Sequence, residues 1–198
     1  MKHFFHMLAA FFVILLLSYC NLKGSRQPLP NTPIISMDLK SFPELNKVLI
    51  ALEKGYRVEG SVLGEGSILS KQWKNYEQLS KIATTGQLII LTNHRSPTVR
   101  CYVFQALAAR HSSKVFEVLQ KHLQDTARIE AMDGCFVWRE FTGDYFINIV
   151  TSNPIEIDSY TLNRREKSKL DSILRNDKSI VLAAKSELIE TDKLGSSK

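Results

Sequence analysis

The chain has 198 residues, a mass of 22.5 kDa and a formal charge of +6 at pH 7. Hydrophobic residues make up 44% of the sequence and charged residues 23%. These values are typical of a folded globular protein, and they exclude collagen-like, low-complexity and wholly disordered chains. Three cysteines are too few for a small domain that is held together by disulfides. We therefore expect one folded domain with extensions.

The N-terminus carries an apolar run over residues 7–17, preceded by the cation Lys2. A helix that crosses a bilayer needs about 20 apolar residues, so the run is short for a spanning segment. A positive start followed by a short apolar stretch is typical of a secretory signal peptide, and a short membrane anchor is the alternative. We predict a signal peptide over residues 1–19.

The residues that end this leader, Leu17-Ser18-Tyr19-Cys20, resemble a bacterial lipobox, although Tyr19 stands where that signal usually has Gly, Ala or Ser. The resemblance implies that Cys20 becomes the first residue of the mature chain and carries several acyl chains, which anchor a protein far more firmly than one chain does. It implies a lipid-anchored protein of the bacterial cell envelope, whose first partner is the membrane. Residues 21–26 lack the acidic residues of some surface-export signals, which favours a periplasm-facing position.

The positive charge falls only by that of Lys2 when the leader is removed. We expect weak attraction to anionic envelope surfaces and no nucleic-acid partner. Residues 20–40 include Pro28, Pro30 and Pro33, which disfavour a helix and extend the backbone. We predict that this segment is a flexible linker that spans about 25 Å as a coil.

A helical body is predicted over residues 41–190, followed by a disordered tail over 191–198. Ser41 and Glu44 match a capping box, and Leu45, Val48, Leu49 and Leu52 then recur at helical spacing up to Gly55. Residues 55–69 are glycine-rich and are predicted to form a loop or a short hairpin. They lack the lysine and the strand–helix context of a phosphate-binding loop.

Further helices are predicted from Ser70 to Asp125. The first carries an apolar stripe beginning at Trp73, and the second is capped by Thr84 or Thr85. A third begins with Ser96 as cap and Pro97 in the first turn, and it is apolar on two faces, so we expect it to be sandwiched between other elements. A fourth helix ends near Asp125.

After Asp125 the apolar pattern becomes less regular, and it becomes helical again from residue 161. Residues 126–142 are expected to be a crossing loop or an extended segment, and residues 144–150 a helix turn or a strand. A charged helix is predicted over 161–174, and a last helix begins at Asp177 or Ser179.

Residues 84–125 resemble one HEAT-type helical repeat of about 40 residues. The resemblance rests on a turn before Pro97, the pair Val99-Arg100 and the pair Ala106-Leu107, while Thr98 replaces the Asp common in the family. It implies that Arg100 pairs with a nearby acid. Because one repeat cannot bury its faces by stacking alone, flanking helices must cap it. The fold class predicted is therefore all-α, a compact HEAT-like stack of helical hairpins.

Candidate chemistry is sparse in this sequence. Cys101 and Cys135 remain after Cys20, and we expect either a disulfide between them or two separate buried thiols. His94 and His111 lie at opposite ends of one predicted helix, about 25 Å apart, so they cannot share an ion. We expect no metal, no cofactor and no catalytic residue, since no serine lies in a nucleophile-elbow context.

Two functions remain open at this stage. The leading hypothesis is a membrane-anchored, periplasmic protein-interaction or scaffold module that binds an envelope protein of unknown identity and is not an enzyme. Such a module should expose a contiguous apolar patch. The alternative is a small-ligand-binding protein or enzyme that uses the Gly55–Gly66 loop as a pocket wall, which requires a cavity of at least about 300 Å³.

Overall fold

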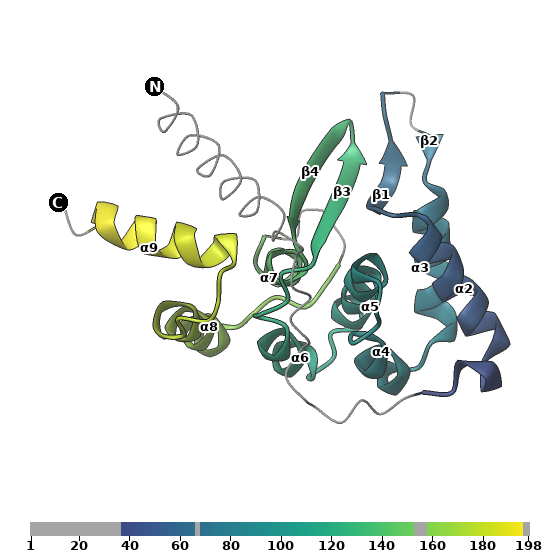
Figure 1. Ribbon diagram of the computed structural model, residues 1–198, viewed down its shortest axis with the longest axis horizontal. Coiled ribbons are helices and arrows are strands. Elements are labelled where there is room, and N and C mark those ends of the chain that lie inside the picture. Colours follow the sequence, from purple (N-terminus) through teal and green to yellow (C-terminus); the bar gives the residue numbers. More distant parts are fainter. Residues whose placement is uncertain (1–36, 66–67, 153–157, 196–198) are drawn as a thin grey trace, which may run out of the picture. The chain divides into compact units, whose positions relative to one another are not determined.

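The computed structural model describes residues 37–65, 68–152 and 158–195, all within one unit of the chain, Pro33–Lys198 (Figure 1). The predicted signal peptide, the predicted lipidation site Cys20 and most of the predicted linker lie outside the described residues. The elements are, in chain order, η1 (Leu39–Ser41), α2 (Pro43–Lys54), β1 (Val58–Leu63), β2 (Ile68–Leu69), α3 (Lys71–Ile82), α4 (Thr85–Leu91), α5 (Pro97–Ala109), α6 (Val115–Lys121), β3 (Arg128–Gly134), β4 (Phe136–Phe141), α7 (Thr142–Thr151), α8 (Arg164–Asn176) and α9 (Ala183–Gly195).

The predicted all-α fold is wrong, because the four strands form one mixed sheet in the order β2-β1-β3-β4. β1 pairs with β2 in a short antiparallel hairpin, and β3 pairs with β4 in a longer one. The two hairpins are joined by parallel pairing of β1 with β3, which places α3 to α6 in the crossover between them. The short hairpin was one of the two structures expected for residues 55–69.

Residues 126–142 were expected to be a crossing loop or an extended segment, and the extended alternative is confirmed, since residues 128–141 form the β3–β4 hairpin. Ile129 and Ala131 alternate with more exposed neighbours, as in a strand with one buried face. The strands meet at a two-residue loop, Gly134-Cys135, where Gly134 has a φ of +53° that glycine adopts without strain. The register runs unbroken from Arg128 opposite Phe141 to the residues that flank this loop.

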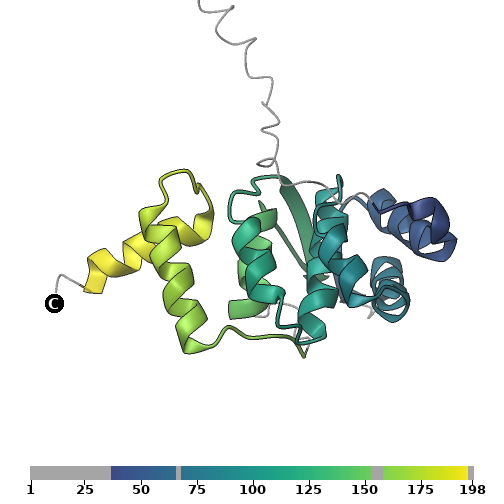
Figure 2. The same cartoon turned by 90° about the horizontal axis from the view of Figure 1, so that it is seen from below.

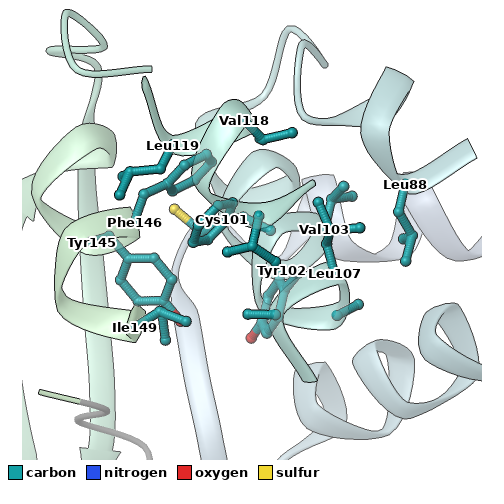
Figure 3. Close-up of a cluster of buried hydrophobic side chains, with 14 of the residues drawn as sticks. Leu88, Cys101, Tyr102, Val103, Leu107, Val118, Leu119, Tyr145, Phe146 and Ile149 are labelled. Atoms are coloured by element: carbon teal, nitrogen blue, oxygen red, sulfur yellow. The ribbon is translucent and has the colours of Figure 1, made fainter. Parts of the chain in front are cut away.

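The helix α5 is the centre of the core, as its two apolar faces predicted. Nearly all of its residues are buried, and it packs most extensively against α4 and α7. α5 and α7 also contact the sheet (Figures 1 and 2), α5 through β1 and β3 and α7 through β4. Figure 3 shows Cys101 among the side chains of Leu119, Tyr145 and Phe146. Full burial of a side chain such as Leu107 contributes about 1.5–3 kcal/mol.

Helix starts were predicted well where a polar cap stands directly before the apolar pattern. Ser70 and Ser96 cap α3 and α5 with their hydroxyl oxygens, and Thr84 forms a full capping box with Gln87. The capping box predicted at Ser41 is wrong: its hydroxyl donates to Asp38 in η1, and α2 begins at Pro43 without a side-chain cap.

Two consecutive residues, Gly55 and Tyr56, end helix α2. Gly55 is the C-cap with an ordinary φ of −76°, whereas the following Tyr56 takes the left-handed conformation at +45°. Glycine is needed at position 55 for space, since an added Cβ would overlap the side chain of Gln72. The predicted helix stop is therefore confirmed, and its cause is packing.

The C-terminal part differs from expectation at both ends of α9. This helix begins at Ala183 rather than at Asp177 or Ser179, and a buried carboxylate of α7, Asp144, accepts hydrogen bonds from the backbone N–H groups of Ala183 and Ala184 at 3.1 and 3.0 Å. α9 continues to Gly195, so residues 191–195 of the predicted disordered tail are helical.

At the N-terminal end of the described residues, Leu39 and Lys40 of η1 lie within the segment predicted to be a flexible linker.

Candidate partner-binding surface

The largest buried polar cluster centres on Arg100 of α5. Its Nε and Nη2 donate to the two carboxylate oxygens of Asp125 at 2.8 and 2.9 Å. The two side chains are only 7% and 5% exposed. Arg100 Nη1 also donates to the backbone carbonyls of His94 and Arg95. The pairing of Arg100 with an acid, implied by the HEAT-type resemblance, is confirmed, and the pair ties the start of α5 to the turn after α6.

The charge state of Asp125 follows from its surroundings. Burial alone raises the pKa of this carboxyl, but the neighbouring His122 and the Arg100 guanidinium together outweigh burial, so its pKa lies below the ordinary value near 3.8. His122 Nδ1 lies 3.5 Å from Asp125 Oδ2 without a hydrogen bond, and its ring packs on Phe146. The hydrogen bonds of this cluster hold α5 against the turn that follows α6.

A second polar cluster joins β1 to α3 and α5. The carboxylate of Glu59 accepts hydrogen bonds from Arg57 Nε at 2.8 Å and from Ser70 Oγ at 2.7 Å. The hydroxyl of the buried Tyr102 contacts the backbone N–H and C=O of the same glutamate. Because burial raises the pKa of Tyr102, its hydroxyl stays neutral and serves as a fixed hydrogen-bonding group.

A third cluster connects β4 to α7. Glu140 accepts from Trp138 Nε1 at 2.6 Å and from Asn148 Nδ2 at 2.8 Å. Burial raises the pKa of Glu140, and the two donors offset only part of that shift. The hydrogen bonds of each of the three clusters therefore hold one element against another, and His122 Nδ1 of the first cluster is a buried atom without a hydrogen bond.

The histidines do not come together. His94 and His111 lie at opposite ends of α5, and His111 pairs with Asp158 at 3.1 Å. Within residues 37–65, 68–152 and 158–195, the structure contains no group of three or more His, Cys, Asp or Glu side chains that could hold a metal ion.

The two cysteines of the body lie in different environments. Cys101 is buried in the core, where burial raises the pKa of its thiol well above the ordinary value, and Cys135 is exposed at the β3–β4 turn. Both are free thiols, so the structure does not contain the disulfide considered from the sequence. The reason is positional: Cys101 lies inside the core beside Leu119, Tyr145 and Phe146, whereas Cys135 lies at the exposed turn of the hairpin.

A shallow groove of about 250 Å³ lies where the start of α2 meets the end of α3 and the start of α4. Its lining includes Phe42, Ile82 and Gln87. Residues 55–65 do not line this groove, and residues 58–63 of that segment form strand β1. The groove is smaller than the 300 Å³ or more that small-molecule sites occupy.

Exposed apolar side chains gather at one end of the sheet, which we call the distal end: Ile68 and Leu69 of β2, and Phe136 and Val137 of β4. The register places them together, because Leu63 is opposite Ile68 on one side and Gly134 on the other, while Phe136 flanks the β3–β4 turn. Both hairpins point the same way in Figure 1. Phe136 is 79% exposed and Ile68 is 66% exposed.

The residues that carry the HEAT-type resemblance lie in α5, and sequence reasoning missed the distal end. Pro97 begins α5, and Val99, Ala106 and Leu107 are fully buried along it. The distal end could have been found from Asp133-Gly134, a dipeptide typical of tight hairpins, because the aromatic Phe136 stands two residues after it.

Comparisons with known proteins give no relative for this chain: no protein-family model, curated protein or solved structure matches it. Among the described helices, none is long and apolar enough to cross a bilayer.

Proposed function

We propose that this chain is a lipid-anchored protein-binding module of the bacterial envelope, periplasm-facing, which binds a protein partner through the distal end of its sheet. The observation that carries the proposal is the exposed apolar group at two adjacent hairpins. Monomeric proteins rarely expose several large apolar side chains together without a partner. Partner binding explains why Phe136 is apolar although it lies at a turn.

Two further features support a binding role. The buried polar clusters around Arg100, Glu59 and Glu140 are engaged in structural hydrogen bonds, so they do not converge on a cavity. The predicted linker after Cys20 would let the body reach partners about 25 Å from the membrane. The lipid anchor itself is supported by the order of Lys2, the apolar run 7–17 and Cys20.

Site-specific photo-crosslinking in bacterial cells that express the full chain tests the binding role. A photo-reactive amino acid is placed at Ile68, at Val137, or at the exposed Ser186 of α9 as a matched control. We expect discrete protein adducts from the two distal positions and none from position 186. Equal adducts from all three positions, or none from the distal two, would contradict the proposal.

The anchor is tested separately by metabolic labelling with an alkyne fatty acid. Label should enter the wild-type chain and be absent from Cys20→Ala. Label that persists in the variant refutes acylation at Cys20, and it leaves the crosslinking result to be judged by itself.

A further inference from the structure

Among the described strands, β4 is the longer of the two edge strands of the sheet. It pairs with β3 over six consecutive positions without a bulge, and it is the last strand of the sheet. The opposite edge, β2, pairs at two positions only. An edge strand presents unpaired N–H and C=O groups along its free side, and its length sets how many hydrogen bonds an added strand can make.

β4 lacks three of the features that proteins use to block such edges: a bulge, a proline and a lysine. Its sequence, Phe-Val-Trp-Arg-Glu-Phe, contains no proline, glycine or lysine, and its aromatic and β-branched residues favour strand pairing. Phe136 and Val137 stand exposed at its start. An edge of this length that carries one exposed charge, Arg139, can pair with a strand that supplies the opposite charge.

The charges around β4 favour an acidic occupant. The side chain of Arg139 is 80% exposed and pairs with Glu130 of β3 at 3.0 Å. Such surface ion pairs contribute little, so Arg139 can turn to a carboxylate on a new strand at small cost. Arg128 lies beside it on the ring of Phe141. The excess positive charge of the whole chain opposes a second copy and favours an acidic partner.

We propose that β4 accepts an added strand from the partner: an extended segment, apolar at alternate positions, with an Asp or Glu opposite Arg139. This inference rests on the proposed protein-binding function and specifies its geometry. Backbone hydrogen bonds along the free edge supply affinity. Alternate side chains of the added strand meet Val137 and Arg139 on one face and Phe136 and Trp138 on the other, which supplies specificity.

A lipid surface fits the same region less well. The distal end carries two carboxylates, because Glu65 lies in the turn after β1 and Asp133 is opposite Phe136 in the β3–β4 register. Insertion of Phe136 and Ile68 into an anionic bilayer would bring these carboxylates against the lipid phosphates, which is electrostatically unfavourable.

Peptide selection on the purified full-length protein in detergent tests the proposal. A phage-displayed library of random linear dodecapeptides is panned on the wild type, and selected peptides are synthesised and their affinities measured. We expect peptides with alternating apolar residues and an acid. Val137→Pro, which removes an N–H and bars strand pairing, should weaken binding about tenfold or more. Val181→Pro, at an exposed position before α9, is the matched control and should bind as the wild type.

Arg139→Glu keeps the test decisive even if the proline variant unfolds. This exposed substitution should reverse the charge preference, so that peptides with Lys or Arg in place of the acid bind better. Selected peptides that ignore both β4 substitutions, or an absence of enriched peptides, would overturn the proposal. So would dimers of the wild type that Arg139→Glu or Val137→Pro dissociates, since the occupant would then be a second copy.

The bilayer is tested with the exposed thiol at the hairpin tip. An environment-sensitive fluorophore is attached to Cys135 of the full-length protein reconstituted in vesicles of phosphatidylethanolamine and phosphatidylglycerol. Its emission should stay that of a water-exposed dye. A blue shift that Phe136→Asp abolishes would overturn strand addition in favour of membrane docking. If Ile68 gives crosslinks but no peptide binds at β4, strand addition at β4 is rejected and the proposed protein-binding function is retained.

Discussion

Removal of Asp125 should be among the most destabilising polar substitutions in the body. Asp125→Ala leaves the Arg100 guanidinium 7% exposed, with only the carbonyls of His94 and Arg95 as partners. Breaking a buried ion pair in this way costs about 3–5 kcal/mol. Since domains have a total stability of about 5–15 kcal/mol, the loss is a large fraction. For a domain of this size it lowers Tm by about 6–20 °C.

Urea unfolding followed by far-UV circular dichroism measures the loss, and a double-mutant cycle with Arg100→Met isolates the pair. Each single variant leaves one buried charge without its partner, whereas the double variant leaves none. The double variant should therefore be less destabilised than the sum of the two single variants. The control is Glu53→Ala, which breaks the Arg95–Glu53 bridge of nearly the same geometry, 2.9 and 3.0 Å, at an exposed site. That loss should be far smaller. Equal losses from Asp125→Ala and Glu53→Ala, or additive effects in the cycle, would refute the assignment of the energy to burial.

Three further predictions follow from packing, pKa and exposure. Gly86→Ala should stabilise by about 0.5–1 kcal/mol, since its Cβ meets open space in α4, whereas Gly143→Ala should destabilise by about 1–3 kcal/mol because its Cβ would lie 2.8 Å from a backbone oxygen; urea midpoints that rank the two in the opposite order would contradict this. The Asp125 carboxyl has a folded pKa below its unfolded value near 3.8, so its contribution is complete above that value and is lost as pH falls through the folded pKa; urea midpoints between pH 7 and 2.5 should fall less for Asp125→Asn than for the wild type. Iodoacetamide should label Cys135 in the native protein and Cys101 only after unfolding, and protection of both would restore the disulfide hypothesis.

The helices were predictable because each signal is local. Ser70, Thr84 and Ser96 bind backbone groups three residues on, so the cap and the apolar stripe that follows fix a helix without reference to the rest of the chain. Ser41 shows the limit of this signal. Asp38, three residues before it, competes for the same hydroxyl and starts a separate turn.

The sheet was not predictable in the same way because its central pairing joins segments far apart in sequence. β1 lies in the glycine-rich segment 55–69, which resembles a loop in sequence until Val58 is paired with Ala131 of β3. Gly60 is needed there because an added Cβ would overlap the Asp133 side chain. No local pattern at either strand specifies this contact.

The candidate surface depended on the same long-range pairing. Ile68 and Phe136 are isolated apolar residues in the sequence, and only the sheet register brings their strands to one end. Buried clusters were partly accessible, since Arg100 was expected to pair with an acid. The Glu59 cluster was missed because Ser70, already explained as a helix cap, also donates to a strand.

The most direct test of the account is photo-crosslinking from Val137 in living cells, with the crosslinked residues identified by mass spectrometry. The account predicts adducts to one extended, acid-containing segment of a partner protein, and their loss when Arg139→Glu is introduced. Adducts only to lipid, only to a second copy of the chain, or unchanged by Arg139→Glu would contradict it.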